Sequence, residues 1–218
     1  TVHDLLTHTS GLTYHFHMAN AVDEMYRSAG FDWTCSPGDL ENQCNVLASL
    51  PLLFDPGTEW NYSYSTDVLG RVVEVVSGLT LDCYMDENIF QPLGMVDTGF
   101  SVPNGEESRF ASCYFPQGEN KQAALLDDAL RSPYLREPIG LSGGGGLVST
   151  LADYHRFTQA LRNNGALDEQ RIIGRKTLQF MTRNHLPGGV DLTQYGRPLF
   201  SDCLLYTSDA ADDTPCVD

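Results

Sequence analysis

Tyr62 is the residue best placed in this sequence to move a proton. It lies in a turn over residues 56–67, directly before a segment whose apolar residues recur at helical spacing. Backbone N–H groups without helical partners and the positive end of the helix dipole gather where a helix starts. Such surroundings stabilise a phenolate, which a tyrosine needs in order to act as a general base near neutral pH. On the local pattern alone, a packing tyrosine with a hydrogen-bonded hydroxyl is the better interpretation.

The segment after this turn is predicted to be an amphipathic helix over residues 68–77. Gly78 is expected to end it, because glycine readily adopts the left-handed conformation common just beyond a helix. The apolar face is predicted to consist of Val68, Leu69, Val72, Val73 and Val76.

Three separated motifs strengthen the catalytic interpretation. They are residues 5–12 (LLTHTSGL), residues 56–94 with the Tyr62 turn, and residues 143–150 (GGGGLVST). In this order they resemble the serine beta-lactamase-related family, which holds class C beta-lactamases, D-alanyl-D-alanine peptidases and family VIII-type esterases. The similarity extends from Thr1 to about Phe200.

The resemblance implies an α+β protein with a beta-lactamase/transpeptidase-like fold. We expect residues 1–202 to form an incomplete domain of this kind, mostly helical over about 1–95. Strands, a glycine loop and helices would follow over about 96–202, the strands forming a fragment of an antiparallel sheet flanked by helices.

Enzymes of this family work by acyl transfer, in which a serine attacks an ester or amide and the acyl-enzyme is then hydrolysed. The resemblance assigns Tyr62 the role of general base and acid, since it matches the tyrosine of the Tyr-x-Asn motif. Tyr64 stands where that motif has the asparagine that contacts the substrate, a replacement that resembles the esterase-like branch more than true beta-lactamases. Tyr64 is therefore a candidate substrate-binding residue.

The serine nucleophile of the family lies in Ser-x-x-Lys, a spacing that places both side chains on one helix face. The two lysines of this chain, Lys121 and Lys176, have Gly118 and Ile173 at that spacing, so the motif is absent here. We expect the serine and its lysine upstream of Thr1, and the third family motif beyond the other end. The chain by itself is predicted to be inactive.

Two alternative functions remain. A non-catalytic relative would keep the fold and only bind a ligand, although the intact Tyr62 turn favours an enzyme. The other alternative uses Ser142, which fits the Gly-x-Ser-x-Gly nucleophile elbow of the α/β-hydrolases. That elbow needs a hydrophobic strand before it and a helix directly after it, whereas Arg136, Glu137 and Pro138 precede it and more glycine follows. The Ser142 alternative is far less favoured.

Four further polar side chains are predicted to be structural or solvated. His8 and Ser10 are close in sequence, whereas a catalytic base normally comes from elsewhere in the fold, so we expect them to hold their loop by bonds to its backbone. His15 and His17 alternate as ligands on a strand would, but no third ligand stands near, so we expect two surface histidines. The sequence predicts no metal site and no cofactor.

The composition limits the classes of molecule that this protein is expected to bind. A formal net charge of -16 without a basic patch disfavours nucleic acid and anionic lipid. The hydrophobic fraction of 41% suffices for a core, and no apolar run reaches the roughly 20 residues of a membrane helix. The expected partner is a small-molecule ester, lactam or peptide substrate. The choice among these, the cellular location and the oligomeric state stay open.

Residues 203–218 resemble the translation of a sequencing adapter, and we exclude them from the fold as an expected artefact. A natural acidic, disordered tail is the alternative. The cysteines before this tail lack the C-x-x-C spacing of zinc and redox sites. Cys35 and Cys44 bracket a short polar loop and would pair in an oxidising compartment, but four free thiols, including Cys83 and Cys113, fit the sequence at least as well.

The remaining elements follow from pattern and caps. The helix beginning near Thr150 is expected to turn Leu151, Tyr154, Phe157 and Leu161 inward. The glycines at 143–146 are expected to serve a positive φ or a close approach. Helices are predicted over residues 20–29, 39–50 (capped by Ser36), 81–90, 151–164 and 175–182, strands over 97–100 and 108–115, and an irregular surface loop over 118–138.

Overall fold

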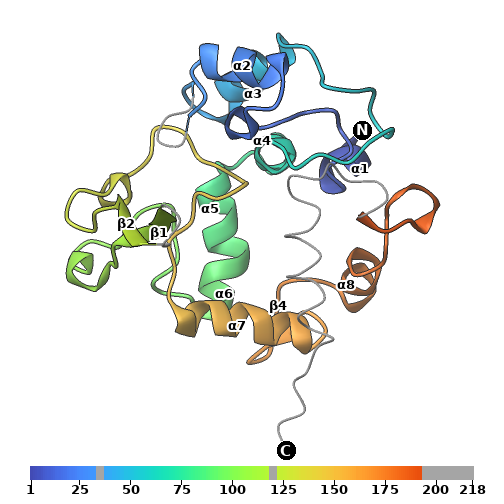
Figure 1. The fold of residues 1–218 in the computed structure, drawn as a ribbon. Helices are drawn as coiled ribbons and strands as arrows, with labels where there is room; N and C mark the ends of the chain where they lie inside the picture. The colour runs from blue at the N-terminus through green and yellow to red at the C-terminus, as the bar shows by residue number, and fades with distance from the viewer. Residues whose placement is uncertain (33–36, 118–121, 193–218) are drawn as a thin grey trace, which may run out of the picture. The chain divides into compact units, whose positions relative to one another are not determined.

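The computed structural model describes residues 1–32, 37–117 and 122–192 (Figure 1). The described chain divides into two compact units, one formed by residues 1–72 with 182–192 and the other by residues 73–181. The predicted change at about residue 95, from a helical part to a part with strands, stays a prediction.

The first unit has a mostly aromatic core. Tyr14, Tyr26, Phe31, Leu47 and Tyr64 are buried there, with Phe16 and Tyr62 among the partly buried side chains packed against them. Aromatic rings bury large apolar areas, so a few of them suffice to hold short helices together. The first unit comprises α1 (Val2–Leu6), the 3-10 turn η1 (His15–His17), α2 (Ala21–Ser28), α3 (Leu40–Ala48), the start of α4 (Ser65–Ser77) and η5 (Pro187–Gly189).

Side-chain caps start α2 and α3, and the helices predicted over residues 20–29 and 39–50 are confirmed. Asn20 accepts hydrogen bonds from two N–H groups in the first turn of α2. Asp39 caps α3 by accepting from the Asn42 N–H, 2.9 Å away. The predicted cap, Ser36, lies outside the described residues, and Asp39 takes the cap position because it directly precedes the helix.

Helix α4 starts at Ser65, closer to Tyr62 than predicted, and ends at Ser77. Gly78 follows with φ +74°, the expected left-handed end. The start of the helix therefore lies only three positions after Tyr62.

The buried side of α4 differs from the predicted apolar stripe. Ser65, Asp67 and Gly70 are buried, whereas Val76 is 82% exposed, so its predicted inward position is wrong. Small and hydrogen-bonded residues line the buried side near the helix start, and a pattern of hydropathy does not register them.

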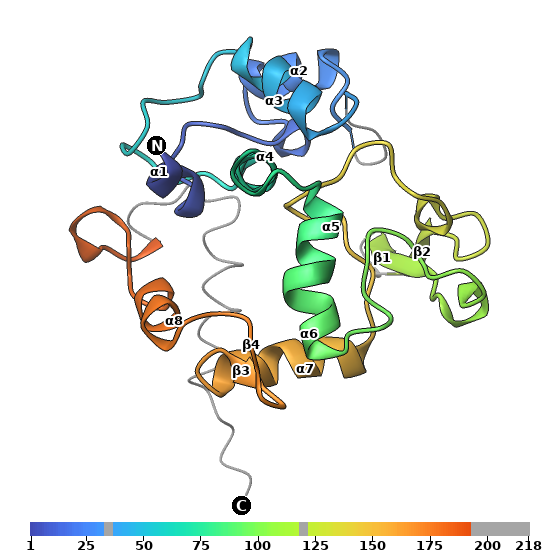
Figure 2. The same ribbon diagram turned by 180° about the vertical axis from the view of Figure 1, so that it is seen from behind.

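The second unit contains one long helical rod, visible in Figures 1 and 2. It ends at Gly94, with φ +62°. The helix predicted over residues 81–90 is confirmed. The rod consists of α5 (Leu81–Met85), the π-helical segment η2 (Asp86–Phe90) and α6 (Gln91–Leu93).

Helix α7 (Leu151–Arg162) confirms the helix predicted after Thr150, but its predicted inward face only in part: Phe157 packs against a buried cluster, whereas Leu151 and Tyr154 face outward. Leu151 is 87% exposed and Tyr154 60% exposed, while Asp153 and Ala160 are buried.

Hydrogen bonding explains the altered face of α7. The Asp153 carboxylate accepts from the Asp97 N–H at 2.8 Å and from the Thr98 hydroxyl at 2.9 Å. These bonds satisfy a buried charge and draw the polar side of the helix inward. On the same helix Ala160 joins the second core, formed with Phe90, Leu93 and Met95.

The predicted strands are only partly correct. Residues 97–100 contribute an isolated bridge between Gly99 and Val148 instead of a strand. Strand β1 (Cys113–Gln117) starts later than predicted, because the 3-10 turn η3 (Glu107–Arg109) occupies the beginning of the predicted range. Arg109 lies in that turn and pairs with Asp97 and Glu106, which favours the turn over extended chain.

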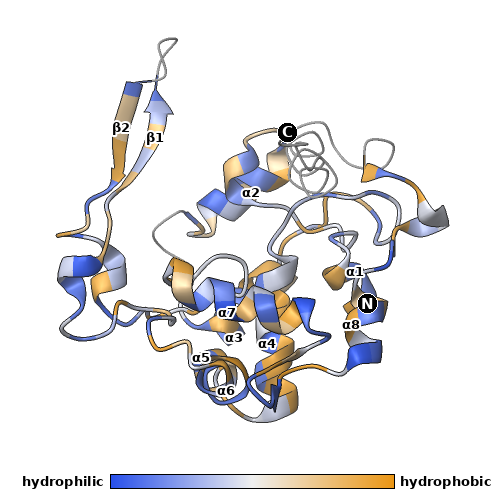
Figure 3. Ribbon diagram, turned by 90° about the horizontal axis from the view of Figure 1, so that it is seen from below, coloured by the Kyte–Doolittle hydropathy of each residue, from blue (hydrophilic) through white to orange (hydrophobic). Residues whose placement is uncertain are grey.

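Strand β2 (Gln122–Asp127) pairs antiparallel with β1, inside the range predicted to be an irregular loop. Its sequence QAALLD does not alternate between apolar and polar residues, so the period of a half-buried strand is missing. Leu125 and Leu126 of β2 are 52% and 66% exposed. Much of β2 accordingly has the hydrophobic colour in Figure 3.

The other elements of the second unit are short. The helix predicted over residues 175–182 is confirmed by α8 (Arg175–Met181). The elements are η4 (Pro133–Leu135), the pair β3 (Ala166–Leu167) and β4 (Gln170–Arg171), and α8 (Arg175–Met181).

Candidate active site

Two of the three sequence motifs lie side by side in the first unit. The backbone of the LLTHTSGL segment accepts hydrogen bonds from the Tyr62 turn: the Asn61 N–H donates to the His8 carbonyl at 2.9 Å, and the Gly57 N–H donates to the Thr9 carbonyl at 2.8 Å. The Asn61 side-chain amide adds a bond to the Leu12 carbonyl at 3.1 Å. The two segments therefore position Tyr62 together, although about fifty residues separate them in sequence.

Tyr62 itself is half-buried and lies just before the N-terminus of α4. Its ring centroid lies 5.2 Å from that of His8 and 5.0 Å from that of Tyr14. Aromatic neighbours on two sides restrict the directions in which the phenol can point. The location of Tyr62 before a helix start agrees with the sequence; its role as general base stays a prediction.

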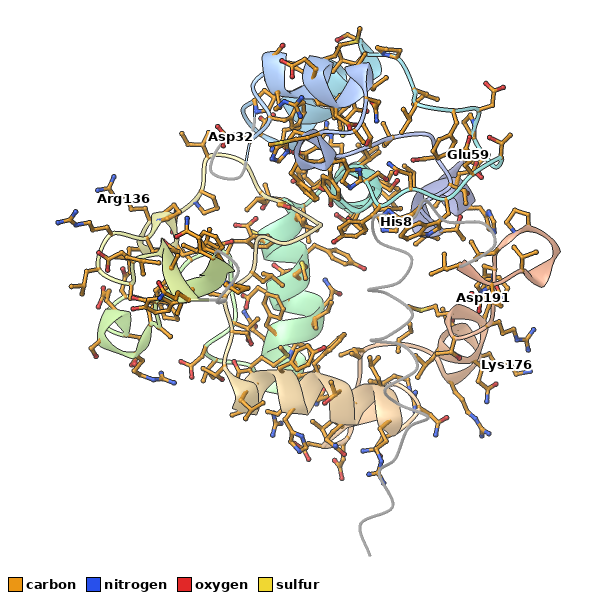
Figure 4. All side chains as sticks on the ribbon, in the orientation of Figure 1. His8, Asp32, Glu59, Arg136, Lys176 and Asp191 are labelled. Atoms are coloured by element: carbon orange, nitrogen blue, oxygen red, sulfur yellow. The ribbon has the colours of Figure 1, made fainter. Side chains whose placement is uncertain are left out.

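His8, labelled in Figure 4, follows α1 and has left-handed backbone with φ +55°. Its Nδ1 lies 3.3 Å from the Ser63 hydroxyl, and its ring makes an edge contact with Trp60 at 6.0 Å. Burial lowers the pKa of His8 to about 4, so the imidazole is neutral at pH 7. The expected bond from its side chain to the backbone of its own loop is a wrong prediction, because its partner is the side chain of Ser63.

A chain of buried hydroxyls continues from this contact. The Ser63 and Ser65 hydroxyls are 2.8 Å apart, and Ser10 lies 2.8 Å from Ser65. The Ser10 hydroxyl accepts from the Leu12 N–H at 3.3 Å, which confirms the expected bond to its own loop. His8 and Ser10 on one segment are thus joined across the fold to Ser63 and Ser65 on the other, so the alternating serines of the Tyr62 turn are the sequence signal for this network.

Tyr64 packs in the aromatic core, with 6% of its surface exposed. Its hydroxyl lies 2.6 Å from His15 Nδ1, and its ring contacts Tyr14 and Phe31 at 4.4 and 4.8 Å. Burial raises the pKa of Tyr64, so the phenol stays protonated. Its substrate-binding role stays a prediction.

His15 and His17 are buried, so the prediction of two surface histidines is wrong. They lie in the 3-10 turn η1 instead of on a strand, and each ring has a hydroxyl partner: Tyr64 for His15, and Thr13 for His17 at 3.2 Å. The Thr13 hydroxyl also donates to the buried Asp23 carboxylate at 2.8 Å. These partners favour the burial of both rings, and the partner of His15 lies forty-nine positions away, where the local sequence does not reveal it.

Ser142 does not have the setting of a nucleophile elbow. Its hydroxyl accepts from the Gly144 N–H at 3.2 Å, inside a turn. Residues 128–141, all described, contain no strand leading into Ser142, and α7 begins only at Leu151. The α/β-hydrolase alternative is therefore wrong. The glycine run serves a close approach at Gly146, where a Cβ atom would lie 3.1 Å from the Phe100 ring.

The described residues hold no cluster of three or more histidine, cysteine or carboxylate side chains that could bind a metal ion. Cys83 and Cys113 are free thiols. The possible Cys35–Cys44 pairing, Lys121, Gly118 and the segment 203–218 lie outside the described residues or depend on them. Lys176 lies in α8, as its pattern predicts. Among the described helices, none is long and apolar enough to cross a membrane.

Comparison with known proteins agrees with these motifs. A family model for Beta-lactamase matches residues 1–202. Protein Rv1367c of Mycobacterium tuberculosis (strain ATCC 25618 / H37Rv) is 33% identical over 190 residues, covering 85% of this chain and 44% of that protein. Esterase EstB of Burkholderia gladioli is 37% identical over 180 residues, covering 75% of this chain and 45% of that protein. The chain thus spans less than half the length of these curated relatives.

A solved structure is similar over most of the chain. EstCE1, described as a hydrolase with promiscuous acyltransferase activity, superposes with a TM-score of 0.70 at 26% identity. The match covers 88% of this chain and 52% of EstCE1. The fold class, helices with small antiparallel sheets, is therefore shared.

Proposed function

Because the chain belongs to the Beta-lactamase family, we propose that it forms the part of a serine hydrolase in which Tyr62 moves protons during acyl transfer. The family consists of serine hydrolases with a beta-lactamase/transpeptidase-like α+β fold, as the sequence predicts, and includes esterase and acyltransferase relatives. The observation that carries the proposal is the pairing of the LLTHTSGL segment with the Tyr62 turn at the start of α4.

In the proposed reaction Tyr62 acts twice. The Ser-x-x-Lys serine, which residues 1–218 do not contain, loses its proton to the Tyr62 oxygen as it attacks the ester carbonyl. Tyr62 then gives this proton to the departing alkoxide, leaving an acyl-enzyme and an alcohol. In the second half, Tyr62 takes a proton from water as the water attacks, and returns it to the serine oxygen, releasing the carboxylic acid.

An ester is the proposed substrate class. Tyr64 replaces the asparagine expected in a lactamase-type motif, and its hydroxyl is engaged with His15. Esterase EstB is among the similar proteins, which supports the same choice. A second candidate is acyl transfer to an alcohol, supported by the promiscuous acyltransferase activity for which EstCE1 is described. In that case an alcohol replaces water in the second half, and the product is a new ester.

The test begins by sequencing the gene upstream and downstream of the part that encodes residues 1–218, to obtain its full open reading frame. The protein it encodes should hydrolyse a chromogenic short-chain ester, and Tyr62→Phe should lower kcat by about 10²–10⁴-fold. Tyr114→Phe is the matched control, since Tyr114 is 59% exposed on the β1 strand. Full activity of Tyr62→Phe would contradict the proposal, and the absence of a Ser-x-x-Lys serine from the reading frame would favour a non-catalytic binding protein.

A further inference from the structure

His8 occupies an unusual position for a residue outside the proposed chemistry. Its ring contacts two aromatic residues of the Tyr62 turn, with centroids 6.0 Å from Trp60 and 5.2 Å from Tyr62. Its Nδ1 is within hydrogen-bond distance of Ser63, the residue directly after Tyr62. The side chain of His8 therefore contacts three of the four residues from 60 to 63.

The backbone of His8 contacts the remaining one. Its carbonyl accepts the Asn61 N–H at 2.9 Å. His8 thus holds the turn by main chain and side chain together, on both sides of the Tyr62 position.

The conformation of His8 supports a functional reason for this arrangement. With φ +55° it lies in the left-handed region, which residues other than glycine adopt uncommonly. Conformations of this kind persist where surrounding contacts hold them, and they gather at functional sites. Since burial keeps the imidazole neutral at pH 7, the ring acts by its shape and its hydrogen bond instead of by its charge.

We propose that His8 is a positioning residue for Tyr62: its ring fixes the direction of the phenol, and its bond to Ser63 fixes the backbone that carries it. This inference rests on the proposed function for its catalytic consequence. A phenol that transfers protons must sit within hydrogen-bond reach of the reacting atoms, and small displacements from that position lower the rate strongly.

The contact is tested in the chain itself, without any activity. The ten tyrosines are replaced by 3-fluorotyrosine, and the fluorine resonance of Tyr62 is assigned by its loss in Tyr62→Phe. His8→Asn is the test variant, because asparagine tolerates the left-handed backbone but has no ring. The Tyr62 resonance should move toward its position in the urea-unfolded chain, while the resonances of the exposed Tyr114 and Tyr154 stay in place.

Thr13→Val is the control for a general loss of stability. Thr13 is fully buried and its hydroxyl bonds to Asp23 and His17, and not to Tyr62, so the variant weakens the same unit and should leave the Tyr62 resonance in place. In the ester-hydrolysing protein, His8→Asn should lower kcat by about 10- to 100-fold with KM changed less than about threefold, and Thr13→Val should leave both nearly unchanged.

The outcomes separate the two proposals. An unmoved Tyr62 resonance in folded His8→Asn overturns the positioning role, whatever the activity. A moved resonance together with full activity of Tyr62→Phe overturns the proposed function and leaves the contact established without a catalytic consequence, which also removes the positioning role in catalysis. If His8→Asn fails to fold, nuclear Overhauser contacts between the His8 and Tyr62 rings in the unsubstituted chain decide: their absence overturns the proposal and their presence supports it.

Discussion

The Tyr64 hydroxyl lies 2.6 Å from His15 Nδ1, inside the aromatic core of the first unit. This bond joins η1 to the start of α4 across forty-nine positions of sequence. It also occupies the hydroxyl of Tyr64, the residue for which the sequence predicts contact with substrate. A structural role of Tyr64 predicts that Tyr64→Phe lowers stability, whereas a substrate-binding role predicts that it weakens substrate binding.

Tyr64→Phe should lower the free energy of unfolding by about 1–3 kcal/mol, because the buried His15 nitrogen loses its hydroxyl partner. Urea unfolding followed by circular dichroism measures this change. Tyr154→Phe, at a 60% exposed position, is the control and should change it by less than about 0.5 kcal/mol. If KM for an ester rises strongly in Tyr64→Phe while stability is unchanged, the predicted substrate contact is supported and the structural role fails.

Stability should rise with pH between about 4 and 6.5 because of His8. Its pKa is about 4 when folded, against the usual 6.5 of a solvent-exposed histidine, so in this window the unfolded chain binds more protons than the folded one. The contribution is complete above pH 6.5, falls as the pH is lowered, and levels off below about 4. The difference is about 3 kcal/mol at most, at 1.36 kcal/mol for each unit of pKa.

Urea midpoints measured from pH 4 to 7 check this slope, with His8→Asn as the comparison. The variant should show a shallower slope and not a flat one, because burial also lowers the pKa of His15. An equal slope in both proteins would contradict the lowered pKa of His8.

Gly11→Ala should destabilise the chain by about 2 kcal/mol or more. Gly11 has φ +83°, and an added Cβ would lie 2.3 Å from the Phe54 carbonyl oxygen, so the two segments would have to separate. Gly30→Ala is a matched control: Gly30 has φ +94° but open space around its Cβ position, so only the backbone term of about 1 kcal/mol remains. Thermal unfolding of both variants measures the difference, and equal losses would mean that close approach is irrelevant at Gly11.

Asp153→Ala should cost about 2–3 kcal/mol in the second unit. The Asp97 N–H and the Thr98 hydroxyl would lose their acceptor in a buried place. Glu106→Ala removes an exposed ion pair with Arg109 and should cost less than about 1 kcal/mol. Hydrogen exchange of the amides around residues 97–98 gives a local readout, and unchanged protection there would contradict the assigned role of Asp153.

The sequence predicted helices more accurately than strands. Caps such as Asn20 and Thr150, and terminal glycines such as Gly78, are local signals, and the structure confirms the helices they delimit. Strand β2 has no such signal, since pairing with β1 decides its conformation. The inward faces of α4 and α7 were also beyond local pattern, because buried polar side chains such as Asp153 turn toward partners that only the fold supplies.

The order of three motifs and the place of Tyr62 before a helix were determined by the sequence alone, and with them the family and fold class. Tertiary structure alone decided that residues 8–13 lie along residues 57–64, that His8 touches Tyr62, and that His15 and His17 are buried. The physical reason is range. Caps and turns depend on bonds between near neighbours in sequence, whereas these contacts join side chains some fifty positions apart and exist only once the core has formed.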